Sequence, residues 1–500
     1  MSEQQSASYG NIFKTTFVYG SVQVIRMLLA LVKNKLVAIL LGAGGMGIIS
    51  IFTHLTGFIQ TGCGLGISQS AIRDISEARG ADNSDRFSRI ISVVSRVVVL
   101  TSLLGAVVTV IMSPMLSKWG FGDYSQTFSF ILIAIAVAAN IFTENQMAIL
   151  KGMRQVKAMA NAGIIGSVVG LLTGVPIFFV WGREGIPASI IVTAVSGALV
   201  SNWYVRKIKY KKAALSFREL LTEASPMVRM GSVLMLSNFL TSITSMLVTV
   251  YIGKNGSLED VGCYGAGSVL MINYFSMVTT ALFTDYYPRI AAVWDKDEVV
   301  TSELNKQSLV GMTLMFPLCV IFVGFSVFFI KLLYSAEFLP AIQFTNYAVF
   351  GLLISVVSDC MGYILIAKRE SKLILRINVT YQIVFLPIQL LSFKYFGLLG
   401  LGVVRAINVL SQLLLYSVVI KKMYGILANK NIYLQLLFEV VFILALVFLC
   451  QYIQNDFYRY GIIILMILFS GGYSWIIMKR QMNINMFSYV KDKIHGRKKK

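Results

Sequence analysis

Long apolar stretches recur along almost the whole chain and are separated by short polar segments. Each stretch is close to the roughly 20 residues that an α-helix needs to cross about 30 Å of hydrocarbon. The pattern predicts about 14 transmembrane helices with short loops and leaves no room for a large soluble domain. The expected limits are 13–35, 46–72, 88–112, 124–150, 159–181, 186–205, 226–252, 262–288, 307–333, 341–367, 374–396, 399–420, 433–453 and 460–478.

Composition supports a multi-pass membrane protein. Of the 500 residues, 56% are hydrophobic and only 13% are charged, whereas soluble proteins carry about 25% charged residues. The first apolar stretch is long and contains Arg26, Lys33 and Lys35, unlike the apolar region of a signal peptide, so we expect it to be retained. The five cysteines show no metal-ligand or redox spacing and are expected to be packing residues.

The distribution of Lys and Arg predicts the orientation. With the N-terminus inside, the even-numbered loops and the C-terminal tail carry 30 basic residues, and the odd-numbered loops carry six. The positive-inside rule therefore predicts that both termini are cytoplasmic. The same distribution accounts for the net charge of +21 without nucleic acid as a partner. We expect the basic tail to contact anionic lipid.

The chain aligns with itself at a shift of about 215 residues. Gly47 then matches Gly262, and Gly182 matches Gly397. Six spans separate the copies, so both copies have the same orientation, as in a parallel repeat. The all-α fold is therefore expected to contain two six-helix lobes, with alternating access to a substrate site between them. The expected divisions are an N-terminal lobe 1–218, a C-terminal lobe 219–430, two further helices in 431–480 and a basic cytoplasmic tail 481–500.

Basic residues in the predicted spans or at their ends are the candidate substrate-binding groups of a cationic cavity. A cation in hydrocarbon costs roughly 2.5–3.5 kcal/mol on insertion scales, so most must face an aqueous cavity or a partner. Arg26 lies near the middle of the first span, and an acid partner on another helix is the alternative to a cavity. The full candidate set is Arg26, Lys33, Lys35, Arg73, Arg229, Arg289 and Arg405.

Several of these cations could also reach a membrane surface. Lys33 and Lys35 could reach the outer surface, and Arg73, Arg229 and Arg405, which we expect near cytoplasmic helix ends, could reach the inner one. Arg289 is within one residue of the repeat equivalent of Arg73. A cation that recurs at the mouth of each lobe suits the capture of a phosphate group.

Polar residues form a stripe beside the first cations. Tyr19 and Gln23 share one helix face with Arg26 and Lys33. Asn238 and Ser242 share a face of the seventh span and are candidates for a matching stripe in the lumen. Alternatively, they form a hydrogen-bonded seam between helices.

Glu144 and Asp359 are acids within the predicted spans and differ by 215 positions, so they are repeat equivalents. They are candidates for pairing with the cavity cations or for binding H⁺ or Na⁺ as a coupling ion.

The sequence does not indicate an enzyme. It contains two histidines and no P-loop, HExxH, GxSxG or zinc pattern, so we expect a transporter without a metal, an organic cofactor or ATP hydrolysis. Asp295-Lys296-Asp297 is formally a DxD sequence. It lies in a short loop with no domain around it and is expected to be a solvated charge cluster.

The segment 36–77 contains two glycine-rich motifs followed by a cation: Leu41-Gly42-Ala43-Gly44-Gly45-Met46-Gly47, Thr61-Gly62-Cys63-Gly64-Leu65-Gly66 and Arg73. In these features it resembles the start of polysaccharide-unit (O-antigen, Wzx-type) flippases of the PST branch of the MOP superfamily. The plan of two six-helix lobes is similar over the full length. The resemblance implies a MATE/MOP-like fold with a V-shaped cationic cavity. It also implies transport of an undecaprenyl-pyrophosphate-linked oligosaccharide from the cytoplasmic to the periplasmic leaflet of a bacterial inner membrane, with a polysaccharide polymerase as a candidate partner.

Three alternatives remain open. The two extra C-terminal helices resemble those of lipid II flippases, in which they form a groove for the lipid tail. A drug exporter of the same fold is expected to bind cations in an acid-rich lumen, and the mainly basic deep charges disfavour it. A membrane-embedded glycan polymerase needs a sizeable outer loop, and the predicted outer loops are short.

Overall fold

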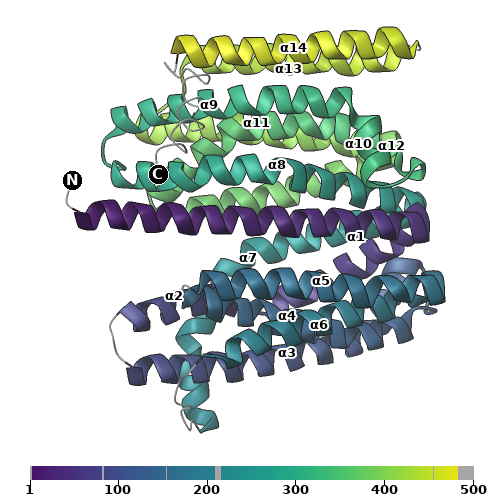
Figure 1. The fold of residues 1–500 in the computed structure, drawn as a ribbon, viewed down its shortest axis with the longest axis vertical. Helices are drawn as coiled ribbons and strands as arrows, with labels where there is room; N and C mark the ends of the chain where they lie inside the picture. The colour runs from purple at the N-terminus through teal and green to yellow at the C-terminus, as the bar shows by residue number, and fades with distance from the viewer. Residues whose placement is uncertain (1–2, 81–83, 154, 209–215, 454, 482–500) are drawn as a thin grey trace, which may run out of the picture. The chain divides into compact units, whose positions relative to one another are not determined.

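The computed structural model of the chain is all-helical and divides into two compact units, which are described separately (Figure 1). Unit 1 comprises Met1–Gly265 and Leu332–Phe338, and unit 2 comprises Ala266–Lys331 and Leu339–Lys500. The structure describes residues 3–80, 84–153, 155–208, 216–453 and 455–481, and for residues 3–27 and a few others it describes the backbone alone. The predicted basic tail lies almost wholly outside the described residues. The expected lobe boundary at 218 and 219 stays a prediction.

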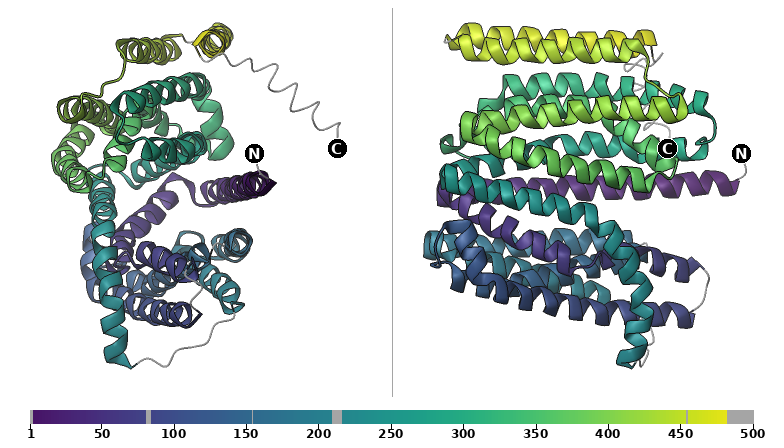
Figure 2. Two further views of the ribbon diagram at one scale, coloured as in Figure 1. Left: turned by 90° about the vertical axis from the view of Figure 1, so that its left-hand side faces the viewer. Right: turned by 180° about the vertical axis from the view of Figure 1, so that it is seen from behind.

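Unit 1 is a helical bundle in which α4 and α6 pack together, α3 packs on α4, and α1 packs on α5 and α7. Figure 2 shows the same helices from two further sides. The elements of the unit are α1 (Glu3–Cys63), α2 (Ile67–Gly80), α3 (Ser84–Phe121), α4 (Thr127–Gly152), α5 (Val156–Trp181), the 3₁₀ helix η1 (Gly182–Gly185), α6 (Ile186–Arg206), α7 (Phe217–Asn255), the start of α8 (Leu258–Ala292) and the 3₁₀ helix η2 (Ala336–Phe338).

Unit 2 contains the rest of α8 and the C-terminal helices. α11 packs along α12, and α13 and α14 both pack on α9 and lie side by side (Figures 1 and 2). The elements are α9 (Asp297–Gly324), most of α10 (Ser326–Leu333), α11 (Ala341–Ala367), α12 (Ser371–Tyr424), α13 (Lys430–Tyr452) and α14 (Asp456–Gln481).

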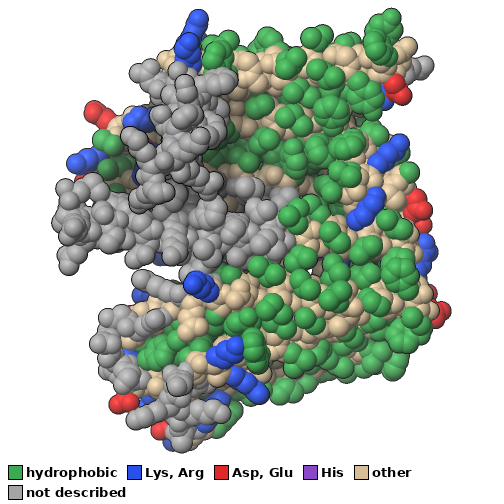
Figure 3. Space-filling model, viewed as in Figure 1, with side chains coloured by type: hydrophobic (Ala, Val, Ile, Leu, Met, Phe, Trp, Pro, Cys, Tyr) green, Lys and Arg blue, Asp and Glu red, His purple; other side chains and the backbone are tan. Residues whose placement is uncertain are grey.

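Ten stretches of the described residues are long and apolar enough to cross a membrane. Lys157–Arg206 and Ser371–Tyr424 each contain two of the predicted spans, so the expected total of 14 crossings stays a prediction. Hydrophobic side chains cover most of the face shown in Figure 3, and charged side chains lie mainly toward the helix ends. The protein is thus a multi-pass, all-helical membrane protein.

Two predicted spans are broken in the structure. The predicted helix 46–72 is interrupted at residues 64–66, where Leu65 and Gly66 have positive φ angles of 50° and 62°. The predicted helix 307–333 ends at Gly324, and α10 begins two residues later. The second break was not visible in the hydropathy because the residues on both sides of it are apolar, whereas the first separates the apolar α1 from the more polar α2.

The 215-residue repeat recurs in the backbone conformation of each unit. Gly182 after α5 has φ 51° and ψ −130°, and its repeat equivalent Gly397 within α12 has φ 59° and ψ −143°. Both angles lie in a region that glycine adopts without the steric cost of a side chain. The amide of Gln155 donates to Leu150 O at 3.0 Å, and the equivalent amide of Glu370 donates to Leu365 O at 2.9 Å. The repeat register found in the sequence therefore extends to local structure.

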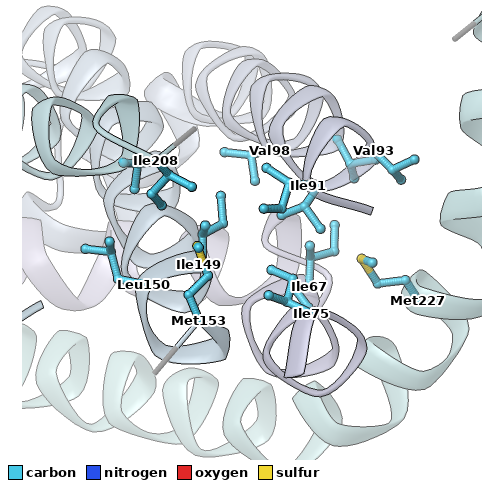
Figure 4. Packing of buried hydrophobic residues seen from close by; sticks show 14 of the residues in the cluster. Ile67, Ile75, Ile91, Val93, Val98, Ile149, Leu150, Met153, Ile208 and Met227 are labelled. Carbon is cyan, nitrogen blue, oxygen red and sulfur yellow. The ribbon is translucent and has the colours of Figure 1, made fainter. Parts of the chain in front are cut away.

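A core of buried aliphatic side chains fixes α2 within unit 1 (Figure 4). Ile67, Ala71 and Ile75 of α2 are fully buried and recur every four residues, so they share one helix face. Ile91 of α3 and Ile149 of α4 belong to the same cluster. Since one face of α2 is buried in this way, its remaining positions are free to carry polar groups.

Candidate functional site

The cations of α1 precede a sharp change of direction in the chain. Gly42, with φ 68° and ψ −173°, separates two helical segments within α1. Lys33 is half-buried and forms no ion pair with any described residue. The Lys35 ammonium donates a hydrogen bond to the backbone carbonyl of Tyr334. The side chains of Tyr19, Gln23 and Arg26 lie outside the described residues, so their predicted place in a cavity stays a prediction.

The second segment of α1 is capped by an acid from another part of unit 1. The Ala43 amide, just after the change of direction, donates to Glu337 Oε2 at 3.0 Å. The Cys263 thiol lies 3.8 Å from the backbone carbonyl of Glu337. A carboxylate at a helix N-terminus accepts an otherwise unpaired amide and opposes the positive end of the helix dipole.

We expect Glu337→Ala to destabilise the detergent-purified protein by about 1 kcal/mol, because it removes this cap. Thermal unfolding followed by tryptophan fluorescence measures the effect as a lower midpoint temperature. Glu337→Gln retains an oxygen acceptor and should lose less. An exposed acid of the same unit, replaced in Glu184→Ala, provides the control. Equal midpoints for Glu337→Ala and Glu184→Ala would contradict the assigned cap.

Arg73 and Arg229 lie on helices that pack together in unit 1. Both side chains are exposed, and Arg73 Nη1 lies 3.4 Å from Met230 Sδ, next to Arg229 in the sequence. The start of α2 approaches α7 closely, because a Cβ atom on Gly66 would overlap the backbone of Gly231. Arg73 and Arg229 form no ion pair within the described part of the chain. Two of the predicted cations therefore lie on neighbouring helices, and neither has a carboxylate within ion-pair distance among the described residues.

Arg289 has a different environment from Arg73. Its guanidinium contacts Glu303 Oε2 at 2.5 Å and Gln307 Oε1 at 2.7 Å, both on α9. This arrangement satisfies much of its hydrogen-bonding capacity within the protein. The proposed role of Arg289 as a substrate ligand stays a prediction.

Arg405 lies in the second helical segment of α12, and its predicted place near a cytoplasmic helix end stays a prediction. It follows the Gly397 break by eight residues and precedes the helix end at Tyr424 by nineteen, or about 29 Å at 1.5 Å per residue. The side chain is exposed and has no acid partner among the described residues.

The predicted polar stripe of α7 divides between two roles. Ser242 Oγ lies 3.2 Å from Thr61 Oγ1 of α1 and also donates to Asn238 O at 2.9 Å. Ser242 thus belongs to a hydrogen-bonded seam between α1 and α7, which was the alternative reading of the sequence. The Asn238 side chain is exposed and remains a candidate lumen group.

The two repeat-equivalent acids have unequal surroundings. Glu144 is exposed on α4 and forms no ion pair with a described residue. Asp359 of α11 is partly buried and lines a cavity of about 770 Å³ within unit 2. Ser355, one helical turn before Asp359, lines the same cavity. Neither acid is paired with a predicted cation in the described residues, and their role in ion coupling stays a prediction.

The cavity of unit 2 was not predicted. α8, α11 and α12 form its walls, and it lies in the size range of small-molecule sites in proteins. Its rings include Phe283 and Tyr363, which stack at 5.0 Å between centroids, and Tyr287, which is 40% exposed. Asp359 and Asn378 supply polar groups, and no Lys or Arg occurs among the described residues that line it.

A further acid, Glu439 of α13, was overlooked in the sequence although it lies inside the predicted span 433–453. Its side chain is fully buried, and Gln435 Nε2 donates to Oε1 at 2.7 Å. The other oxygen has no hydrogen-bond partner among the described residues. The presence of an acid within an apolar predicted span is the sequence feature that could have identified Glu439. The residue lies where α13 packs on α9 and α14, so we assign it to that packing.

The DxD sequence takes part in an ion pair. Asp297 accepts a hydrogen bond from the Lys368 ammonium at 2.5 Å, and the same ammonium lies 4.7 Å from the ring centre of Tyr424. These contacts join the start of α9 to the ends of α11 and α12. They suit the predicted charge cluster and not a catalytic metal site.

The sequence profile described as "Polysaccharide biosynthesis protein" matches residues 12–294, which is more than half of the chain. The chain belongs to this family. The lipid III flippases of Escherichia coli (strain K12) and Shigella flexneri are each 22% identical to it over 354 residues, which cover 68% of this chain and 82% of theirs.

Solved structures support the fold of the MOP superfamily. The lipid II flippase MurJ in an inward closed conformation has a TM-score of 0.72 and 12% identity, and the match covers 94% of this chain and all of MurJ. An inward-facing multidrug resistance MATE transporter of the MOP superfamily has a TM-score of 0.65 and 16% identity, and the match covers 82% of this chain and 99% of the transporter. The MATE/MOP-like fold expected from the sequence is confirmed at this level.

Proposed function

We propose that the protein is a flippase for an undecaprenyl-pyrophosphate-linked oligosaccharide repeat unit. In this proposal it moves the repeat unit from the cytoplasmic to the periplasmic leaflet of a bacterial inner membrane by alternating access, for surface polysaccharide biosynthesis. The family match over residues 12–294 carries the proposal. The similarity to lipid III flippases supports a lipid-linked substrate. Both termini are cytoplasmic in this scheme, and a polysaccharide polymerase is the proposed partner.

The basic side chains supply the chemistry that this substrate needs. A pyrophosphate cannot cross hydrocarbon without compensation for its charge, and arginine binds phosphate through paired N–H groups. Lys33, Arg73, Arg229 and Arg405 have no carboxylate partner among the described residues. We propose that these cations, with Arg26, Lys35 and Arg289, line a cationic route for the pyrophosphate. The polyprenyl tail remains in the surrounding lipid.

Lipid II is the alternative lipid-linked substrate, and one observation favours it. The MurJ structure matches 94% of this chain, whereas the MATE transporter matches 82%. The pair α13 and α14 exposes large apolar side chains, among them Leu437, Leu465 and Leu468, which suit contact with lipid. A groove for a lipid tail at these helices is compatible with either substrate.

A drug exporter is the alternative from a different class of transporter. The aromatic cavity with Asp359 favours it, because a carboxylate among aromatic rings attracts organic cations. Lys33, Arg73 and Arg229, which have no carboxylate within ion-pair distance among the described residues, disfavour a carrier of organic cations. No observation gives comparable support to an enzymatic function, because the relatives named above are flippases and transporters.

The driving force in this proposal is an ion gradient or the membrane potential. Glu144 and Asp359 are the proposed groups for H⁺ or Na⁺, with no bound cofactor. A potential that is negative inside also favours the outward movement of an anion, by about 2.3 kcal/mol per charge per 100 mV.

Mass spectrometry of polyprenyl-linked lipids in a strain that lacks the protein tests this function. We expect a complete lipid-linked repeat unit to accumulate and the wild-type protein to restore the normal pool. Accumulation of the lipid II glycan would favour the lipid II flippase. An incomplete glycan would indicate an enzyme, and an unchanged pool would favour the drug exporter.

A further inference from the structure

The cavity of unit 2 combines aromatic walls with hydrogen-bonding groups over a considerable length. On α8 it extends from Met271 to Pro288, which is seventeen residues, or about 25 Å at 1.5 Å per residue. Aromatic side chains from all three helices face it, including Phe275 and Tyr363. A ligand with several linked rings is therefore better matched to the cavity than a single ion.

The cavity does not suit a pyrophosphate. Asp359 is acidic, and no basic residue occurs among the described residues of its lining. Arg289, which follows Pro288 directly, contacts Glu303 and Gln307 of α9. A diphosphate bound in the cavity would lie beside a carboxylate without a cation from the lining to neutralise it, which is unfavourable in a site of low polarity.

The cavity does not suit a purely apolar ligand either. A polyprenyl chain would bury Asp359 and Asn378 against hydrocarbon and leave their polar atoms without partners from the ligand. Each polar group that is left unsatisfied in this way costs about 1–3 kcal/mol. The ligand must therefore present both apolar and hydrogen-bonding surface.

A saccharide has this combination of surfaces. One face of a pyranose ring presents C–H groups that pack on aromatic rings, and its hydroxyl groups donate to carboxylates and bond to amides. Tyr363 stacks on Phe283 and lies 5.9 Å from the ring of Tyr287, so the three rings form one aromatic surface. Asp359, one turn before Tyr363 on α11, places an acceptor beside that surface.

Gly362 lies in the same wall of the cavity and leaves space there because it has no side chain. It lines the cavity, and the nearest atom to a Cβ there would be in the Tyr416 ring, at 3.4 Å. The absence of a side chain thus leaves the Tyr416 edge accessible from the cavity. Gln412 Nε2 donates to the Tyr416 hydroxyl at 3.2 Å, which fixes the ring in place.

We propose that this cavity binds the sugar residues of the lipid-linked substrate and gives the protein its preference among glycans. The inference rests on the proposed flippase function. In this scheme the basic residues bind the pyrophosphate that all such lipids share. The unit 2 cavity recognises the attached sugars. The Tyr363 and Asp359 side chains are the proposed specificity-determining groups.

Binding to the full-length protein in lipid nanodiscs tests this division. The two probes are undecaprenyl pyrophosphate and the undecaprenyl-pyrophosphate-linked glycan extracted from a strain that lacks the protein. We expect the wild-type protein to bind the glycan-bearing lipid more tightly by about tenfold, or ~1.4 kcal/mol. Tyr363→Ala, Asp359→Asn and Gly362→Met should each remove this preference and leave the affinity for undecaprenyl pyrophosphate unchanged.

Two further variants control for stability and chemistry. Tyr363→Phe retains the aromatic ring and should retain most of the preference. Tyr395→Ala removes a tyrosine of the same unit that is 70% exposed and outside the cavity, and it should behave as wild type.

The outcomes separate the inference from the proposed function. If the wild-type protein binds both lipids equally, the inference fails and the flippase function stands. If it binds neither lipid, the proposed function fails, and the inference fails with it. If Asp359→Asn abolishes transport but keeps the glycan preference, Asp359 acts in ion coupling alone and its assignment to the sugar site is wrong. Binding of tetraphenylphosphonium that needs Asp359, with an unchanged glycan preference, would instead identify a drug site.

Discussion

Replacing Lys33, Arg73 or Arg229 of unit 1 should abolish most transport without unfolding the protein. The variants Lys33→Met, Arg73→Gln and Arg229→Gln each remove a charge that has no carboxylate partner among the described residues. A hydrogen bond to a charged group contributes about 1.5–3 kcal/mol, so each loss should slow transport roughly 10- to 150-fold. Clearance of the accumulated lipid-linked glycan from a deletion strain measures the effect.

The matched control for these variants is a basic residue of the same unit in the last turn of a helix. Lys118, at the end of α3, lies 5.7 Å from the ring centre of Tyr124, and Lys118→Ala should transport normally. Lys33→Arg keeps the charge and should retain most activity. If the cation variants accumulate normally in the membrane and also transport normally, the proposed cationic route is wrong.

The second large effect is expected at a close contact between two backbones. Gly47 of α1 and Gly262 of α8, which are repeat equivalents, pack against each other within unit 1. A Cβ atom on Gly47 would overlap the Leu258 carbonyl oxygen, and one on Gly262 would overlap that of Ala43. Overpacking typically costs 1–3 kcal/mol, and it should cost more here because backbone atoms cannot rotate away.

Gly47→Leu and Gly262→Leu should therefore prevent stable accumulation of the protein in the membrane. Quantitative immunoblotting of membrane fractions and size-exclusion chromatography in detergent measure the loss. A Cβ atom on Gly57, in the same helix as Gly47, would meet no described atom within 4 Å, so Gly57→Leu should accumulate normally. Comparable yields of folded Gly47→Leu and Gly57→Leu proteins would contradict the packing described.

Hydropathy predicted most helix positions because each predicted span must be apolar along its whole length. The predicted helix 341–367 coincides with α11, and the predicted end at residue 181 coincides with the end of α5. The repeat was also visible in the sequence, since the turns at Gly182 and Gly397 require the same residue type. The break at residue 325 escaped notice, because a change in φ and ψ leaves the mean hydropathy unchanged.

The candidate site was only partly predictable. The sequence identified the basic residues because a charge in an apolar segment is conspicuous, but it could not show that Arg289 contacts Glu303. It also could not distinguish a lumen role for Ser242 from its bond to Thr61. The unit 2 cavity was inaccessible from sequence, because its lining combines residues as far apart as Met271 and Tyr416.

The central claim, that the protein translocates a lipid-linked glycan, is tested most directly in proteoliposomes. Purified protein is reconstituted with the glycan-bearing lipid from the deletion strain, and an external glycosidase then cleaves the glycan on accessible lipids. Protein-free vesicles should lose only the outer-leaflet glycan. Vesicles with the wild-type protein should lose nearly all of it, and those with Arg229→Gln should lose the inner-leaflet share slowly. Protection of the inner-leaflet glycan in the presence of folded wild-type protein, equal to that in protein-free vesicles, would contradict the account.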